Sequence, residues 1–162
     1  MRLASVLRMN DGYRMESVRI PITRLTSLEL PLPEYFSPGA SGMDLPAAIR
    51  EPVVIESGEF RLIPCGFALA IPIGFEAQIR PRSGLASRYG VTVLNAPGTI
   101  DSDYRGEVMA LLINHGKAPF AVAPGMRVAQ LVLARVARVQ WESTEALPAS
   151  DRGEGGFGHT GA

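Results

Sequence analysis

Two carboxylates and a tyrosine lie together in one polar segment of the chain, Asn95–Val108, which reads NAPGTIDSDYRGEV. Apolar, β-type runs flank the segment on both sides, and Pro97-Gly98 within it is a strong turn signal. The pattern therefore predicts a β-hairpin whose tip carries Asp101, Asp103 and Tyr104. Aspartate is also an ordinary turn residue, so a solvated turn is the alternative. The aromatic side chain and the apolar residue beside the first aspartate favour a binding or catalytic site.

A second segment, Pro81–Ser87 (PRSGLAS), has the composition of a phosphate-binding helix start. Ser83 is a suitable N-cap, and Gly90 is the residue type preferred just past a helix C-terminus. Helix N-termini present free amides and a partial positive charge. Gly84 would let a phosphate approach the backbone, and Arg82 would add a permanently charged, two-pronged donor. An ordinary capped helix with a surface arginine explains this segment equally well.

A lone carboxylate, Asp44, stands between Met43 and Leu45 in the turn-rich segment Ser37–Ala47. A carboxylate among apolar neighbours costs free energy unless it is paired or bound to a metal. Mg²⁺ commonly takes one or two carboxylates together with substrate phosphates. For this segment taken alone, a simple turn or helix cap is the favoured interpretation.

The last twelve residues, 151–162 (DRGEGGFGHTGA), are rich in glycine and offer little to bury. They formally match GxGxxG, but a dinucleotide-binding fold needs a helix and a second strand after that motif, and the chain has only four more residues. A glycine-rich tail that carries Arg152 and Phe157 suits a lid that closes on a ligand, with the arginine on phosphate and the ring on a base. A frayed terminus is the alternative.

Composition excludes several classes of function. The 162 residues suffice for one domain with a proper core, and the net charge of zero provides no global field for nucleic acid or an anionic membrane. The single cysteine, Cys65, excludes an internal disulfide and a cysteine metal cluster, and its apolar surroundings predict a buried small hydrophobe. There is no P-loop. No apolar run reaches the length of about 18 residues that a membrane-spanning helix needs. We expect a cytoplasmic protein with no nucleic-acid or membrane partner.

The elements that must position these residues are mostly short strands separated by Gly, Pro and Ser turns, the pattern of an all-β sandwich. Strands are predicted over 18–22, 53–55, 60–63, 66–71, 75–79, 91–94, 108–113 and 126–136, and the one short helix over 83–89. Pro64-Cys65 is interpreted as a hairpin-like break. The last strand is apolar on both faces, so it needs cover on both sides, from the sandwich interior or from another subunit.

The predicted domain organisation has four parts. Residues 1–17 form a flexible N-terminal extension, 18–140 a single β domain, 141–150 a linker whose composition shifts to Glu, Ser, Thr, Ala and Pro, and 151–162 a flexible C-terminal lid.

Five segments, in this order, resemble the five motifs of the trimeric deoxyuridine triphosphatases, the dUTPase family. They are ASGMDL (40–45), PRSGLA (81–86), NAPGTIDSDYRGEV (95–108), RVAQLVL (127–133) and RGEGGFGHTG (152–161). The resemblance implies an all-β, distorted jelly-roll sandwich or barrel (β-clip) with one short helix. It implies a homotrimer with an exchanged C-terminal tail and three active sites shared between subunits. It also implies hydrolysis of dUTP to dUMP and pyrophosphate with Mg²⁺, which keeps uracil out of DNA and supplies dUMP for thymidylate synthesis.

The resemblance also implies roles for individual residues. Asp101 would orient and deprotonate the attacking water and would touch the sugar, Tyr104 would lie under the deoxyribose, and Asp44 would reach the metal through water. The other substrate-binding residues would be Arg82, Ser83, Gly84, Asn95, Thr99, Ile100, Met109, Gln130, Arg152, Phe157, Gly158, His159 and Thr160. The common family pattern has Ser at the position of His159, so the hydroxyl contact to the γ-phosphate expected there is in doubt.

Two other hypotheses fit the same pattern. A deoxycytidine triphosphate deaminase shares the fold, but the IDSDY hairpin and the lid segment favour the dUTPase family, and ammonia release from dCTP would separate the two. A non-catalytic trimer that binds nucleotides or proteins should have lost the base or the lid, whereas Asp101 and Arg152 are both present.

Overall fold

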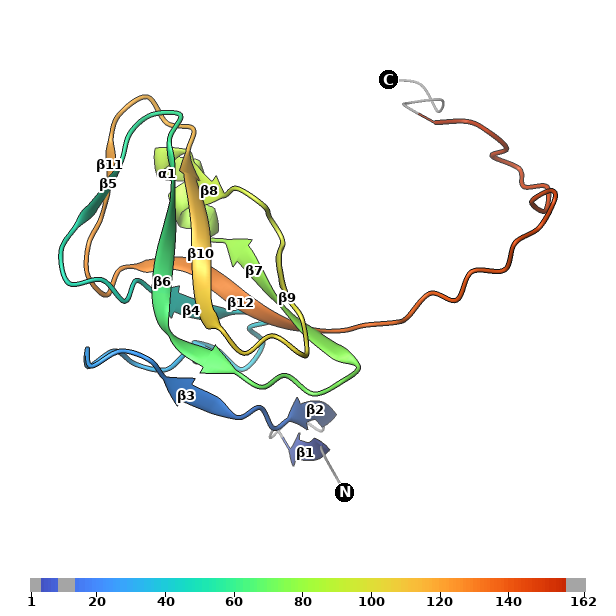
Figure 1. Cartoon of the computed structure of the whole chain (residues 1–162), viewed down its shortest axis with the longest axis horizontal. Helices are drawn as coiled ribbons and strands as arrows, with labels where there is room; N and C mark the ends of the chain where they lie inside the picture. Colours follow the sequence, from blue (N-terminus) through green and yellow to red (C-terminus); the bar gives the residue numbers. More distant parts are fainter. Residues whose placement is uncertain (1–3, 9–13, 157–162) are drawn as a thin grey trace.

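The computed structural model describes residues 4–8 and 14–156. Two antiparallel four-stranded sheets make up the body of the protein, with strand orders β3-β6-β10-β8 and β4-β12-β7-β9 (Figure 1). Two-stranded pairs, β1-β2 and β11-β5, complete the strands. The elements are β1 (Ala4–Arg8), β2 (Arg14–Val18), β3 (Ile22–Arg24), β4 (Met43–Pro46), β5 (Val53–Ile55), β6 (Phe60–Leu69), β7 (Phe75–Pro81), α1 (Ser83–Tyr89), β8 (Val91–Val93), β9 (Gly98–Ile100), β10 (Glu107–Asn114), β11 (Phe120–Val122) and β12 (Arg127–Arg135).

The core lies between the two sheets and draws on both. In β7 the predicted alternation is confirmed, because Ala77 and Ile79 are buried while Arg80 is exposed. In β10 every second side chain is buried, and Leu112 is fully enclosed. Strand β12 lies between β4 and β7 and buries residues on both of its faces, as its apolar sequence predicts. The all-β fold with one short helix is therefore confirmed.

Strand β6 corrects one prediction. Pro64-Cys65 does not break the chain into a hairpin, because β6 runs without interruption from Phe60 to Leu69 and pairs with β10. The pairing register shifts between Glu107 and Met109, and Gly66 takes a left-handed conformation (φ 79°) close to this irregularity. A bulge is a place where a strand tolerates a proline that cannot donate to the ladder. The proline and glycine therefore mark a bulge inside one long strand.

The predicted strand over 18–22 is also wrong. Strand β2 ends at Val18 and β3 begins at Ile22, and Pro21 lies between them without an amide hydrogen for a ladder. Residues 4–8 and 14–18 pair with each other as β1 and β2, and all of them except Val18 belong to the predicted N-terminal extension.

The segment between β8 and β10 connects the two sheets. The flanking strands pair as predicted, with Leu112 opposite Val93. The chain between them leaves that sheet, however, and forms β9, which pairs with β7 of the other sheet so that Ile100 lies opposite Ala77. Asp101 follows β9 directly, so the register of the second sheet fixes where the carboxylate stands.

Beyond β12, residues 136–156 extend away from the body as a long segment in which no strand or helix is described (Figure 1). Its apolar side chains are uncovered: Trp141 is 89% exposed, and Val139 and Leu147 are also largely exposed. Among the described residues no helix is long and apolar enough to cross a membrane.

Candidate active site

Strand β12 brings the first group of predicted site residues together. Its residue Gln130 lies opposite Asp44 of β4 on one side and opposite Arg80 of β7 on the other. The side-chain amide of Gln130 donates a hydrogen bond to the carbonyl of Pro81 (2.9 Å), at the end of β7. A Cβ atom at Gly42 would overlap the end of the Gln130 side chain, so a larger residue there would push the Gln130 amide aside. Segments distant in the sequence thus form one polar cluster beside the start of α1.

Two arginines neutralise Asp44 in this cluster. The Nε atom of Arg82 lies 3.0 Å from Asp44 Oδ1, and Nη1 of Arg127 lies 3.1 Å from Asp44 Oδ2. Arg82 Nη1 also donates to the backbone carbonyl of Arg127 (2.9 Å). The Asp44 side chain is only 17% exposed, so this pairing supplies the partners that a largely buried carboxylate requires. The cluster carries a net positive charge, which suits a polyphosphate.

Helix α1 starts beside the cluster and corrects the predicted cap. The N-cap is Arg82, in an extended conformation (φ −89°, ψ 126°) and without a side-chain cap bond, so Ser83 is the first helical residue. Its first turn contains no acidic residue, and Ser83 and Gly84 are exposed. The first amides of a helix have no partner inside the helix, so this end offers donors to an anion. The predicted C-terminus is confirmed, because Gly90 caps the helix in the left-handed conformation (φ 70°).

The second group of predicted residues surrounds the turn after β9. Asp101 is exposed, and its backbone carbonyl accepts a hydrogen bond from the amide of Tyr104 (3.2 Å). The Tyr104 hydroxyl donates to the carbonyl of Glu107 (3.1 Å). A Cβ atom at Gly106 would overlap the Tyr104 ring, so glycine at that position lets the ring approach the backbone closely. The turn therefore presents a carboxylate and an aromatic face in a fixed relation.

Other predicted residues support this turn. Thr99 is exposed and Ile100 buried, while Met109 is half-buried on β10. Asn95 lies against Gly98, where a Cβ atom would come within 3.3 Å of the asparagine Nδ2. A pocket of about 330 Å³ opens beside the turn and is lined by Ile73, Gly74, Phe75, Glu76, Asp101, Ser102, Asp103, Val136 and Arg138.

The two groups of residues lie at opposite ends of β7. Asp101 follows Ile100, which pairs with Ala77 near the start of the strand, whereas Arg82 follows its last residue, Pro81. Six residues of strand at about 3.3 Å each separate the two ends by about 20 Å. The phosphates of one nucleotide span much less than this. Within a single chain, therefore, the backbone of the carboxylate turn lies well apart from that of the phosphate cluster.

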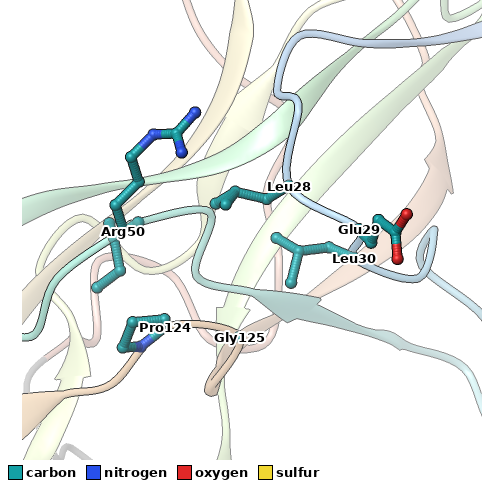
Figure 2. A pocket seen from close by; sticks show the side chains of 7 residues that line it. Leu28, Glu29, Leu30, Arg50, Pro124 and Gly125 are labelled. Atoms are coloured by element: carbon teal, nitrogen blue, oxygen red, sulfur yellow. The ribbon is translucent and has the colours of Figure 1, made fainter.

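Figure 2 shows a further pocket, of about 310 Å³. It is lined by Leu28, Glu29, Leu30, Ile49, Arg50, Pro124 and Gly125. None of the predicted site residues lines it.

The C-terminal tail is described only in part. Arg152 lies in a turn, where its Nε donates to the carbonyl of Gly155 (2.6 Å). Phe157, Gly158, His159 and Thr160 lie outside the described residues, so their predicted roles stay predictions.

Comparison with known proteins decides the family. The dUTPase family model matches residues 29–161. The chain belongs to the dUTPase family. The resemblance inferred from the five sequence segments is thereby confirmed.

Relatives in the dUTPase family match most of the chain. A deoxyuridine 5'-triphosphate nucleotidohydrolase of Syntrophotalea carbinolica is 54% identical over 147 residues, which cover 91% of this chain and 99% of that protein. One from Rickettsia felis is 50% identical with the same coverage. Among solved structures, the Staphylococcus bacteriophage 80alpha dUTPase with dUPNHPP has a TM-score of 0.78 at 24% identity and covers 89% of this chain and 99% of its own. The dUTPase of Staphylococcus aureus phage phi11, in a D95N mutant with a structural Mg(II) ion, has a TM-score of 0.69 at 22% identity and covers 79% and 97%.

The donor set determines how a dUTPase-family chain of this kind could hold Mg²⁺. Among the described residues, no group of three or more His, Cys, Asp or Glu side chains could bind a metal ion. Both oxygens of Asp44 already accept from arginines. These residues fit Mg²⁺ that arrives on the phosphates and keeps its waters, because such an ion needs few protein ligands. They do not fit a preformed all-protein cage.

Sequence reasoning assigned no role to one residue of this site, Arg127. It begins the fourth family segment, and an arginine at the start of a strand that is otherwise apolar was the available signal. Its partner Asp44 lies 83 positions earlier, so only the β4-β12 pairing shows that the two meet.

Proposed function

We propose that this protein hydrolyses dUTP to dUMP and pyrophosphate. The observation that carries the proposal is the pair of complementary half-sites. One is a cationic cluster at a helix start (Asp44, Arg82, Arg127), and the other is a turn that presents Asp101 and Tyr104. The half-sites contain the family's first four segments in the order and spacing of dUTPases, and relatives about 50% identical bear the name deoxyuridine 5'-triphosphate nucleotidohydrolase.

In the proposed reaction Asp101 accepts a hydrogen bond from a water molecule and aims it at the α-phosphorus. The water oxygen forms a bond to phosphorus, and its proton passes to the carboxylate. The bond from the α-phosphorus to the oxygen that bridges to the β-phosphate breaks, and pyrophosphate leaves with that oxygen. Asp101 is exposed, so its carboxylate can reach a water molecule bound beside the nucleotide.

The phosphates would be held by Arg82, the amides of Ser83 and Gly84, and Gln130. This part of the proposal depends on positioning and charge stabilisation, which supply most of the catalysis in phosphoryl transfer. Mg²⁺ on the phosphates would neutralise developing negative charge, with Asp44 in contact through water. Arg152, Phe157, Gly158, His159 and Thr160 would close over the nucleotide, with His159 a tolerated replacement for the usual serine.

Selectivity would come from the turn after β9. The Tyr104 ring, fixed by its bond to Glu107 and packed on Gly106, would lie against C2′ of deoxyribose and leave no space for a ribose hydroxyl. Backbone groups near Asn95, Thr99, Ile100 and Met109 would read uracil. A site that hydrogen-bonds one pattern of donors and acceptors leaves polar groups unpaired with another base. The close approach at Gly98 would refuse the thymine methyl group.

We further propose that each active site is shared between copies of the chain. The roughly 20 Å between Asp101 and Arg82, estimated from the strand rise, supports a site made from Asp101 of one copy and the phosphate cluster of another. Because two different surfaces would meet, the contact would be head-to-tail, and such contacts form a ring where the rotation between copies closes. The ring of three comes from the family. Exposed Trp141, Val139 and Leu147 support a C-terminal segment that covers a neighbour.

The proposed parts of the chain are those of the sequence prediction: an extension (1–17), the β domain (18–140), a linker (141–150) and a lid (151–162). The proposed role is to keep uracil out of DNA and to supply dUMP for thymidylate synthesis, in the cytoplasm.

The test is a product assay on dUTP, dCTP, dTTP and UTP with Mg²⁺. We expect pyrophosphate and dUMP from dUTP and little product from the other three. Ammonia release from dCTP would identify a deaminase instead. Binding of dUTP without any product would identify a non-catalytic nucleotide binder.

A further inference from the structure

Two side chains hold Asp44 from different directions, and only one of them is expected to bind phosphate. Arg82 reaches Asp44 Oδ1 from the end of β7, and Arg127 reaches Oδ2 from β12. Under the proposed function, Arg82 must turn hydrogen-bond donors toward an incoming triphosphate. Its Nε–H is the donor that Asp44 receives, so a rotation that turns the guanidinium fully toward phosphate takes this hydrogen bond from Asp44.

The loss matters because Asp44 is largely buried. With 17% of its side chain exposed, the carboxylate cannot replace a lost partner fully with water, and an unpaired, partly buried charge is costly. A second cation that stays in place would remove this cost.

Arg127 has the anchoring that such a cation needs. Its guanidinium lies over the ring of Phe36, 5.1 Å from the ring centroid, within the range of a cation–π interaction. Its backbone belongs to β12, which is paired on both sides. Its side chain is 50% exposed, so its guanidinium also stays in contact with water.

We infer that Arg127 is a positioning residue for the phosphate site. Arg127 stays ion-paired with Asp44 when Arg82 turns to phosphate. It therefore lowers the free-energy cost of breaking the ion pair between Arg82 and Asp44. Arg127 acts through Asp44 and does not itself hold the nucleotide. The inference rests on the proposed function for the identity of the ligand.

A double-mutant cycle in the full-length protein tests this role. The variants are R127M, D44N and D44N/R127M, and the measurement is the Kd for dUpNHpp in buffer with EDTA, so that no metal takes part. We expect R127M to weaken binding about tenfold, the size of one charge-assisted hydrogen bond in a half-exposed setting. In the D44N background the same substitution should change Kd less than about twofold. The side chain that D44N introduces carries no charge, so breaking its contact with Arg82 leaves no unpaired carboxylate for Arg127 to neutralise.

Two companion variants sharpen the test. R127K keeps the charge and should recover part of the affinity, about threefold, because Lys lacks the planar group that stacks on Phe36. Arg61→Met is the matched control, since Arg61 is equally exposed (47%) and pairs with Glu59 at 3.2 Å; it should leave Kd unchanged. In turnover of dUTP with Mg²⁺, R127M should raise KM and leave kcat within about threefold.

The outcomes separate the two proposals. If R127M weakens binding equally in the wild-type and D44N backgrounds, Arg127 touches phosphate directly and the positioning role is overturned. If R127M has no effect on Kd in either background, the role is likewise overturned. If the wild-type protein itself fails to bind dUpNHpp, the proposed function fails first and the inference about Arg127 fails with it.

Discussion

Replacing Gly106 with alanine should displace Tyr104 and relax the choice between deoxyribose and ribose. A Cβ atom at this position would lie 3.0 Å from Tyr104 Cε2 and would overlap the ring and hydroxyl atoms beyond it. The ring must therefore move, and the hydrogen bond from its hydroxyl to the Glu107 carbonyl must break.

The size of the effect follows from these two changes. The lost hydrogen bond is worth about 1 kcal/mol, and an off-rotamer side chain costs about 0.5–1.5 kcal/mol. Together they give about 1.5–2.5 kcal/mol against the productive position of the ring, which corresponds to a loss in kcat/KM for dUTP of about 10–70-fold. The kcat/KM for UTP should fall less, because the displaced ring no longer excludes the 2′-hydroxyl of UTP. Discrimination between dUTP and UTP should therefore fall, by as much as about 10–70-fold if turnover of UTP is unchanged.

The assay is pyrophosphate release from dUTP and UTP by the wild-type protein and the variant. Gly39→Ala is the matched control, because a Cβ atom there meets nothing within 4 Å and its backbone is not left-handed. Unchanged discrimination in the Gly106→Ala variant, with the fold intact, would refute the role of Tyr104 as the barrier to ribose.

Three further predictions concern the core, the tail and the thiol. Leu112→Ala should lower the free energy of unfolding by about 2–5 kcal/mol, because the side chain is fully buried between the sheets; denaturant titration measures the change, and a loss below about 1 kcal/mol would contradict the assigned core. Deleting residues 151–162 should leave the oligomer intact by light scattering and remove most dUTP turnover; a fully active truncated protein would contradict the lid. Burial, with a smaller contribution from Glu107, raises the pKa of the Cys65 thiol to about 12, so a thiol reagent at pH 8 should react only after unfolding. Because the folded state favours the protonated thiol, that part of the stability is present below the unfolded pKa and is lost between about pH 9 and 12; rapid labelling of the native protein would contradict this burial.

The sequence predicted features that depend on local chemistry. Helix α1 ends where Gly90 follows it, and β7 alternates as its side chains require. The family follows from five short segments because each keeps its residue types and its order along the chain.

The errors arose where distant contacts decide the structure. Pro64-Cys65 has the composition of a turn, but pairing with β10 keeps β6 continuous and turns the irregularity into a bulge. Ser83 is a good cap by residue type, yet Arg82 takes the cap position. Its backbone is extended there, and its side chain donates to Asp44 and to the Arg127 carbonyl. Tertiary hydrogen bonds outweighed local preference in both cases.

The relation between the two half-sites was beyond any local pattern. Asp101 and Arg82 are 19 positions apart in the sequence, but the β7-β9 register places them at opposite ends of one strand. Arg127 escaped notice for the same reason, since its contact with Asp44 exists only through strand pairing.

The central claim is that Asp101 of one copy acts on phosphates held by Arg82 of another, and mixing inactive variants tests it most directly. D101N and R82M, each expected to be inactive alone, are unfolded together in equal amounts, refolded and assayed for pyrophosphate release from dUTP. In a head-to-tail ring each contact receives a working Asp101 with probability about one half and a working Arg82 with the same probability, so about one quarter of wild-type activity should return. If the mixture stays as inactive as its components although the copies have exchanged, the two residues serve the same chain and the account is contradicted.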